Sequence, residues 1–422
     1  MTLTRCGPLL PGLVEPSRQQ LSNGVDIVSL TMSEAPLVCI DFWCRAGSVF
    51  QKEGESGMAH FLEHMIFKGS QELAAGEFDR RVEALGGSSN AATGFDDVHY
   101  HVLIPAAGAS QALDLLLNLV LRPRLEADAF AMERQVVLEE LAQSEDQPED
   151  VAVQKLLELA CPAHPYGEPI LGRRQALLHQ KPGEMESFHH RLYRADRCVL
   201  ALGGAFGDGD LIRQAADGPL AGLDPAEDDD HPHPLTVVPG EHRMAVPRLE
   251  SARLLMAWWQ PPAADLEGVM GADLATTVLA EGRRSRLVHR LREELRIVES
   301  IDLDLHAMEC GSLALLEAVC EPEELPEVRR AIDAVWSEVM REPVGAMEWA
   351  RARRLVTNGY RFGLEAAGGV TGLIGNAQLW GRSQRLDAPL TMLERWNPLS
   401  LRQQALRSLD PSRACILEAV PA

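Results

Sequence analysis

The two halves of this chain repeat one order of predicted strands and helices. PLVCIDFWC in the first half and RLLMAWW in the second read as buried strands, and helical stretches follow each, the last expected at 389–407. The segment REPVGAMEWARARRLVTNGY is a faded copy of LRPRLEADAFAMERQVVLEEL. An internal repeat of this length predicts an α+β fold of two related domains, each with its own core.

An acidic, proline-rich stretch separates the two halves. It contains DPAEDDDHPHP, a composition typical of an extended and solvated linker. We therefore expect domains at 1–207 and 241–422, with a linker region at 208–240.

Only the first half carries an H-x-x-E-H pattern, inside the apolar run GMAHFLEHMIF. On a helix, His60 and His64 lie one turn apart on one face, where two imidazoles can bind one metal ion. Glu63 lies beside them and can take a proton from an attacking water. The alternative is a surface helix with solvated histidines, but the apolar neighbours would make unpaired polar groups costly.

Two imidazoles leave a metal site incomplete, so a further ligand is needed. A second helical stretch, Leu125 to Glu145, supplies candidates. Glu133 and Glu140 are seven residues apart, two turns along one face, whereas Glu139 points about 100° away from Glu140.

These segments resemble the pitrilysin/insulinase family of zinc peptidases, especially short forms akin to the mitochondrial processing peptidase beta subunit. LSNGVDIVSL, GMAHFLEHMIFKGS, ERQVVLEEL and HPYGEPILG carry the resemblance, which runs over nearly the whole chain. It implies one Zn²⁺ per chain, and two mostly antiparallel sheets covered by helices that form half of a clam-shell chamber. Glu140 lies 76 positions after His64, which is the family's spacing for the third ligand. Glu133 matches a further family carboxylate that supports the site.

The resemblance also assigns substrate-binding residues. GGSSNAATGF matches the strand that pairs with bound peptide, so Asn90 and Ala91 are expected to bind the substrate backbone, although turn chemistry alone explains such a composition. Asp150 falls near a carboxylate that binds substrate arginine in processing-peptidase relatives. The acidic residues around it also suit a solvated loop.

The second half departs from the family pattern. Arg292 matches an arginine that helps to bind substrate and stabilise the oxyanion, but Glu299 stands where the family has a tyrosine, and Arg296 replaces a usual glycine. An ionised carboxylate cannot donate a hydrogen bond. We therefore predict a zinc endopeptidase of unfolded peptides whose metal-bearing chain pairs with a homologous, metal-free subunit that carries the Arg and Tyr. An active homodimer and a non-catalytic core subunit of a larger complex are the alternatives.

Composition argues against other classes of protein. The formal net charge of -22 disfavours nucleic-acid binding. No apolar run is long enough to span a membrane, and the first twenty residues lack the apolar core of a signal peptide, so we expect a cytoplasmic protein.

A second histidine pair occurs in DVHYHVLIP, which reads as a strand. His99 and His101 would share one face of it, a spacing that can suit a metal ion. A solvated or sheet-packed pair is the more common arrangement, and a complete candidate site already exists elsewhere in the chain.

Overall fold

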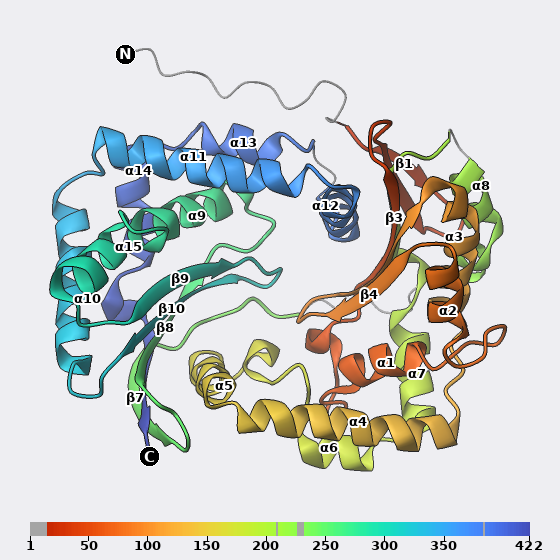
Figure 1. The fold of residues 1–422 in the computed structure, drawn as a ribbon, viewed down its shortest axis with the longest axis horizontal. Coiled ribbons are helices and arrows are strands. Elements are labelled where there is room, and N and C mark those ends of the chain that lie inside the picture. Colours follow the sequence, from red (N-terminus) through yellow and green to blue (C-terminus); the bar gives the residue numbers. More distant parts are fainter. Residues whose placement is uncertain (1–14, 208–209, 226–231, 383–384) are drawn as a thin grey trace. The chain divides into compact units, whose positions relative to one another are not determined.

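The computed structural model describes residues 15–207, 210–225, 232–382 and 385–422. These residues form two compact units, each built on one sheet (Figure 1). The first unit takes its described residues from Met1–Leu141, Pro169–His231 and Arg361–Ala388, and the second takes its own from Ala142–Glu168, Pro232–Tyr360 and Pro389–Ala422. The acidic centre of the expected linker, 226–231, lies outside the described residues.

The sheet of the first unit has six strands in the order β1-β2-β6-β3-β5-β4. Its neighbouring strands are antiparallel, except that β2 and β6 are parallel. The strands are β1 (Ser17–Gln20), β2 (Asp26–Thr31), β3 (Leu37–Cys44), β4 (Ser88–Thr93), β5 (Val98–Pro105) and β6 (Cys198–Gly204).

The sheet of the second unit repeats this topology. Its order is β7-β11-β8-β10-β9, with the parallel pair again at the corresponding place, between β7 and β11. The strands are β7 (Gly240–Val246), β8 (Ala252–Gln260), β9 (Ser300–His306), β10 (Ser312–Cys320) and β11 (Cys415–Pro421). The prediction of two related α+β domains is confirmed by this strand-for-strand match with β2-β6-β3-β5-β4.

Strand β3 is buried on both faces, which its alternating sequence does not reveal. Val38, Ile40 and Phe42 point into the core and are fully buried, as the alternation predicts. Trp43 on the other face is also buried, because helix α12 (Ala367–Leu379) packs there. The fit is close: a Cβ at Gly375 would lie 2.5 Å from Nε1 of Trp43.

Each sheet receives a covering helix from the other half of the sequence. Helix α12 packs on β2, β3 and β6 of the first unit, whereas α5 (Pro148–Ala160) packs on β7, β8 and β11 of the second. Each compact unit therefore includes a segment from the opposite side of the 208–240 stretch. The described residues of 361–388 belong to the first unit, and residues 142–168 belong to the second.

The remaining helices follow the sequence order. In the first half they are α1 (Met58–Ile66), α2 (Glu77–Ala84), α3 (Ala109–Leu121), α4 (Ala127–Asp146), α6 (Arg174–His179), α7 (Pro182–Leu192) and α8 (Asp210–Asp217). In the second half they are α9 (Leu266–Ala280), a π-helix (Val288–Leu295), α10 (Leu325–Arg341), α11 (Ala346–Gly363), α13 (Ala388–Leu393), α14 (Pro398–Gln403) and α15 (Ala405–Ser408). No helix of the described residues combines the length and apolarity needed to cross a membrane.

One expectation about local structure was wrong. The single helix expected at 389–407 is broken into α13, α14 and α15. Pro398 cannot donate a backbone hydrogen bond, and the Asn397 side chain accepts from the N–H groups of Leu399 and Ser400, so a new helix begins there. The linker region expected at 208–240 includes the helix α8, which lies before its acidic, proline-rich core.

The residue after the π-helix, Arg296, adopts the left-handed conformation with φ of 57°. A side chain with a Cβ pays roughly 1–2 kcal/mol in this region, and glycine does not. We expect Arg296→Gly to raise the free energy of unfolding of the second unit by about 0.5–1 kcal/mol, since glycine's flexibility in the unfolded chain offsets part of the gain.

Equilibrium denaturation by urea, followed by circular dichroism, measures this difference. Arg296→Ala is the matched control, because it removes the side chain and keeps the strained backbone. A gain in stability for the alanine variant equal to that for the glycine variant would contradict backbone strain as the cause.

Candidate metal centre

Helix α1 is held in the first unit by its apolar face. Phe61, Leu62 and Met65 are fully buried, and the Phe61 ring lies 4.5 Å from the ring of Phe130 on α4, centroid to centroid. This packing sets α1 against α4. The packing places the H-x-x-E-H motif of α1 beside the carboxylates of Glu133 and Glu140 on α4.

The start of α1 is defined by a tight backbone approach. Gly57 precedes the helix with φ of 83°, and a Cβ there would lie 2.7 Å from the carbonyl oxygen of Leu171. The side-chain oxygen of Gln51 accepts a hydrogen bond from the N–H of Ala59 at 3.0 Å, so one otherwise unpaired donor of the first turn is satisfied. The helix therefore begins at a defined residue, which sets the direction of the motif.

His60, His64 and Glu140 converge between the two helices. Each offers one ligand atom, and these atoms all lie within 4.8 Å of one another. Nε2 of His64 is 3.3 Å from one carboxylate oxygen of Glu140, and Nε2 of His60 is 3.7 Å from the other. Ligand atoms around a tetrahedral zinc ion lie about 3.3 Å apart, so small side-chain adjustments would complete such a site.

The chemistry of these donors also fits zinc. Burial, and then the neighbouring His64, lower the pKa of His60 to about 4, so its imidazole is neutral at pH 7 and keeps a lone pair for a metal. The Glu140 side chain is 42% exposed, which leaves an open side to the cluster. Two imidazoles and one carboxylate with an open position are the ligand set of many catalytic zinc sites.

Glu133 contacts the ring nitrogen of His64 that faces away from Glu140. Its Oε1 lies 2.9 Å from Nδ1 of His64, and its Oε2 lies 2.8 Å from Nζ of Lys68. A hydrogen bond from Nδ1 leaves Nε2 to face Glu140. Sequence reasoning did not identify Lys68, although it lies four residues after His64 and therefore one turn further along the chain from the motif.

Glu63 points to the end of strand β4. Its Oε2 accepts a short hydrogen bond from Oγ1 of Thr93, the last residue of that strand. Burial raises the pKa of Glu63, and the Glu140 charge adds to this, while the Thr93 hydrogen bond and His64 oppose it. A carboxylate with a raised pKa is better matched to proton transfer near neutral pH. No sequence pattern pointed to Thr93.

Asn90 and Ala91 lie on β4, the outermost strand of the first sheet. The Asn90 side chain is exposed, and its Oδ1 accepts a hydrogen bond from the N–H of Ala91 at 3.0 Å. An edge strand with small, exposed side chains is suited to pairing with another extended backbone.

Arg292 and Glu299 belong to the second unit. Arg292 lies in the π-helix and forms an ion pair with Glu293 at 3.0 Å. Glu299 accepts a hydrogen bond from Oγ of Ser251 at 3.1 Å.

Asp150 also belongs to the second unit, in the first turn of α5, where its Oδ2 lies 3.4 Å from Oγ of Ser144. Two neighbours in the expected acidic cluster form ion pairs: Asp146 lies 2.8 Å from Arg248, and Glu149 lies 2.7 Å from Arg253. The carboxylates of this cluster are therefore not all available to a basic ligand.

Comparisons with known proteins agree with the arrangement of the two halves. Residues 27–174 match the family model described as "Insulinase (Peptidase family M16)", and residues 181–356 match "Peptidase M16 inactive domain". An uncharacterized zinc protease of Mycobacterium tuberculosis is 27% identical over 384 residues, which cover 90% of this chain and 87% of that protein. A probable mitochondrial-processing peptidase subunit beta of Arabidopsis thaliana is 30% identical over 194 residues, 46% of this chain and 36% of the relative.

Solved structures share the fold. A protease from Helicobacter pylori has a TM-score of 0.89 at 21% identity and covers 97% of this chain and 100% of its own. A peptidase M16 inactive domain from Pseudomonas fluorescens has a TM-score of 0.85 at 17% identity, with coverage of 96% and 98%. Since models of one family match both halves, and relatives along most of its length are named zinc proteases, the chain belongs to the M16, or insulinase, family of peptidases.

Proposed function

We propose that this chain is the metal-bearing subunit of a zinc endopeptidase that cleaves unfolded peptides. The observation that carries the proposal is the convergence of His60, His64 and Glu140, with the carboxylate of Glu63 on the same helix. These are the groups that peptide hydrolysis at a metal requires: ligands for the ion and a base for the attacking water.

Each residue then has one task. His60, His64 and Glu140 would hold one Zn²⁺ per chain, and Glu133, by accepting a hydrogen bond from Nδ1 of His64, would leave Nε2 of that residue available as a ligand. Lys68 in turn fixes Glu133. When bound, zinc supplies Lewis acidity toward water and toward the peptide carbonyl.

Glu63 would move the proton. Its carboxylate accepts a proton from the attacking water and later donates it to the nitrogen of the leaving amine. The raised pKa makes both transfers feasible near neutral pH, and the hydrogen bond from Thr93 orients the group. Because Thr93 ends β4, the base is anchored to the strand that would carry the substrate.

The substrate would add to the edge of the first sheet. An extended peptide can pair with the backbone of β4, with the Asn90 amide beside the cleaved bond. Folded proteins rarely present an extended strand with unpaired backbone groups, and so the geometry favours unfolded peptides.

The partner is inferred from Glu299. The family resemblance implies a tyrosine at this place that donates a hydrogen bond to the developing oxyanion, and an ionised glutamate cannot do so. A homologous, metal-free subunit that carries the Arg and the Tyr would supply the missing donors. The relative named as a processing-peptidase beta subunit supports a subunit role.

Replacing Glu133 tests how His64 is held. We expect Glu133→Gln to weaken zinc affinity about 10–100-fold, because a neutral amide accepts from Nδ1 less strongly and loses the ion pair with Lys68. Competition with a chromophoric chelator measures the affinity. Glu139→Gln, an exposed position on the same helix, is the control and should bind zinc as the wild type does. Equal affinity in the two variants would remove the assignment.

The role of Glu63 has a pH signature. Glu63→Gln should abolish hydrolysis while zinc stays bound, since the change keeps the shape and removes the base.

Thr93→Val removes a hydrogen bond that lowers the pKa of Glu63, so the pKa of Glu63 rises. Because the base must be ionised, the acidic limb of the kcat/KM profile should move to higher pH. Thr93→Ser keeps the hydroxyl and should leave the limb in place. An unmoved limb in Thr93→Val would contradict this role of Glu63.

The partner is tested by mixing. The purified chain alone should be slow, because loss of one oxyanion donor typically costs about 10²–10³ in rate. Peptide turnover is measured for the lone chain and during titration with a homologous, metal-free M16 subunit that has Arg and Tyr in the corresponding stretch. A rise to a plateau at one equivalent supports the heterodimer. Full turnover by the lone chain, unchanged on titration, would favour an active homodimer, and zinc binding without turnover in any mixture would favour a non-catalytic subunit.

A further inference from the structure

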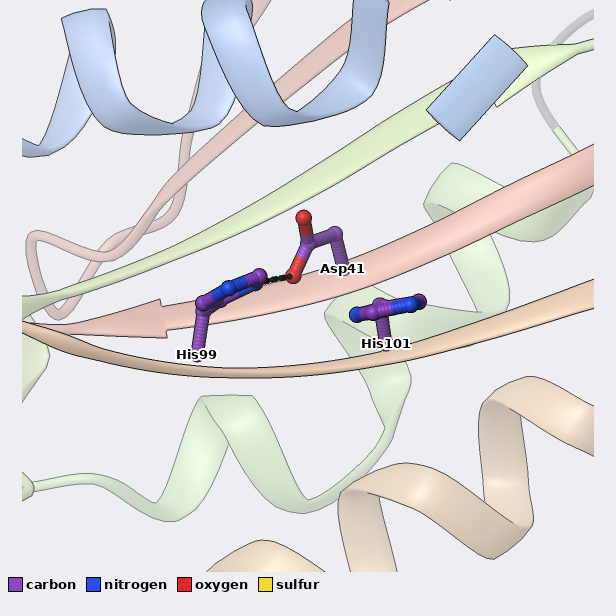
Figure 2. Close-up of side chains that lie close together, drawn as sticks. All are labelled: Asp41, His99 and His101. Atoms are coloured by element: carbon purple, nitrogen blue, oxygen red, sulfur yellow. Dashed lines mark hydrogen bonds and ion pairs between the residues drawn. The ribbon is translucent and has the colours of Figure 1, made fainter. Parts of the chain in front are cut away.

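A second group of side chains of the metal-ligating types lies on the sheet of the first unit and shares no residue with the α1–α4 centre. Asp41 comes from β3, and His99 and His101 come from the neighbouring strand β5 (Figure 2). In the antiparallel register Asp41 is directly opposite His101. The three side chains therefore project from the same face of the sheet.

Their separations suit a single ion. One ligand atom from each residue lies within 4.8 Å of the other two, and Nδ1 of His99 is 3.0 Å from Oδ1 of Asp41. The two imidazole rings are nearly parallel, at 16°, with centroids 5.5 Å apart. Two ligand atoms on one zinc ion are about 3.3 Å apart. Once the ion displaces the Nδ1 proton of His99 to solvent and the hydrogen bond to Asp41 is lost, these two residues have nearly the required spacing, and His101 needs only a modest movement.

The group is also preorganised. Eight consecutive residue pairs join β3 to β5, and Asp41 is only 2% exposed. The ring of His99 stacks on Trp43 with centroids 4.2 Å apart and an angle of 11°. A strand pair and a stacked indole thus hold two of the three ligands before any ion arrives.

One donor atom in the group has no protein partner. Nδ1 of His101 is buried and makes no hydrogen bond to any described residue. Burial lowers the pKa of His101, whereas for His99 the hydrogen bond and charge of Asp41 outweigh the effect of burial and raise the pKa. A buried polar atom without a partner is costly, and a metal ion would satisfy it. The His99 side chain is 23% exposed, which leaves a path from solvent.

We propose that Asp41, His99 and His101 form a second site, for a divalent transition-metal ion. Two imidazole nitrogens and one carboxylate suit Zn²⁺, Co²⁺ or Ni²⁺, whereas Mg²⁺ and Ca²⁺ prefer all-oxygen sites. Three protein ligands leave the remaining positions to water.

The ion would crosslink strands β3 and β5. Strand β5 is the strand on which the edge strand β4 is built. Asn90 of β4 lies opposite His101 in that register. An occupied site would therefore stiffen the sheet directly behind the edge expected to receive a peptide. The site itself does not depend on the peptidase proposal.

Counting bound metal tests the proposal on the full chain. Native mass spectrometry with added Zn²⁺ should show two ions per wild-type chain, one per chain in Glu140→Gln, and one in His101→Ala. His306→Ala is the matched control, because His306 is also a strand histidine but is exposed at the end of β9. It should retain two ions.

A second variant and a second probe cover the case in which His101→Ala folds poorly. Asp41→Asn keeps the size of the side chain and removes its charge, and it should also lose one ion. In a Glu140→Gln background, Co²⁺ should still give the visible absorption of a nitrogen- and oxygen-ligated ion, and His99→Gln in that background should abolish it. If the wild type binds one ion that Glu140→Gln removes, or if His101→Ala and Asp41→Asn both keep two ions, the second site does not exist. That result would not overturn the assignment of the α1–α4 centre. Conversely, loss of peptidase activity alone would not overturn the second site.

Discussion

The packing of α1 against α4 is the contact on which the candidate centre depends. The motif on α1 supplies two imidazoles and the carboxylate of Glu63, but Glu140 and the Glu133 carboxylate that contacts His64 come from α4. The contact between Phe61 and Phe130 and the burial of the apolar face of α1 set the distance between the helices. A loss of that apolar contact would separate the polar groups by more than side chains can recover, since a metal site tolerates errors of only a few tenths of an ångström.

The first sheet places two different polar groups by the alternation of its strands. One face of β3 is apolar and packs into the core, and the opposite face carries Asp41 and Trp43. Helix α12 covers part of this second face, so Asp41 is buried in the middle of a sheet, where a carboxylate needs a partner. His99 supplies a hydrogen bond in the ion-free protein, and in the proposed second site a bound cation would replace that hydrogen bond. The edge strand β4 next to β5 ends at Thr93, which holds Glu63.

In the proposed function the chain combines a metal centre with an incomplete oxyanion site. His60, His64, Glu63, Glu133 and Glu140 are together in the first unit. The second unit repeats the fold without the motif, and Glu299 stands where the family resemblance implies a tyrosine. A division of catalytic residues between two units of the same fold is expected when both contribute to one reaction, because each unit needs to keep only the residues that it contributes.

The sequence by itself determined those features that depend on local periodicity and on spacing. Helical spacing placed His60 and His64 on one face, strand alternation identified one of the two buried faces of β3, and the repeated element order predicted two related domains. The tertiary structure decided what depends on contacts between distant residues. It brought Asp41 to His99 and His101, joined Lys68 to Glu133 and Thr93 to Glu63, and gave each sheet a helix from the other half of the chain. The break in the helix expected at 389–407 was local, but apolar periodicity continued through Pro398 and concealed it. Hydrogen bonds and ion pairs between residues far apart in sequence leave no periodic trace, because each partner alone is an ordinary polar residue.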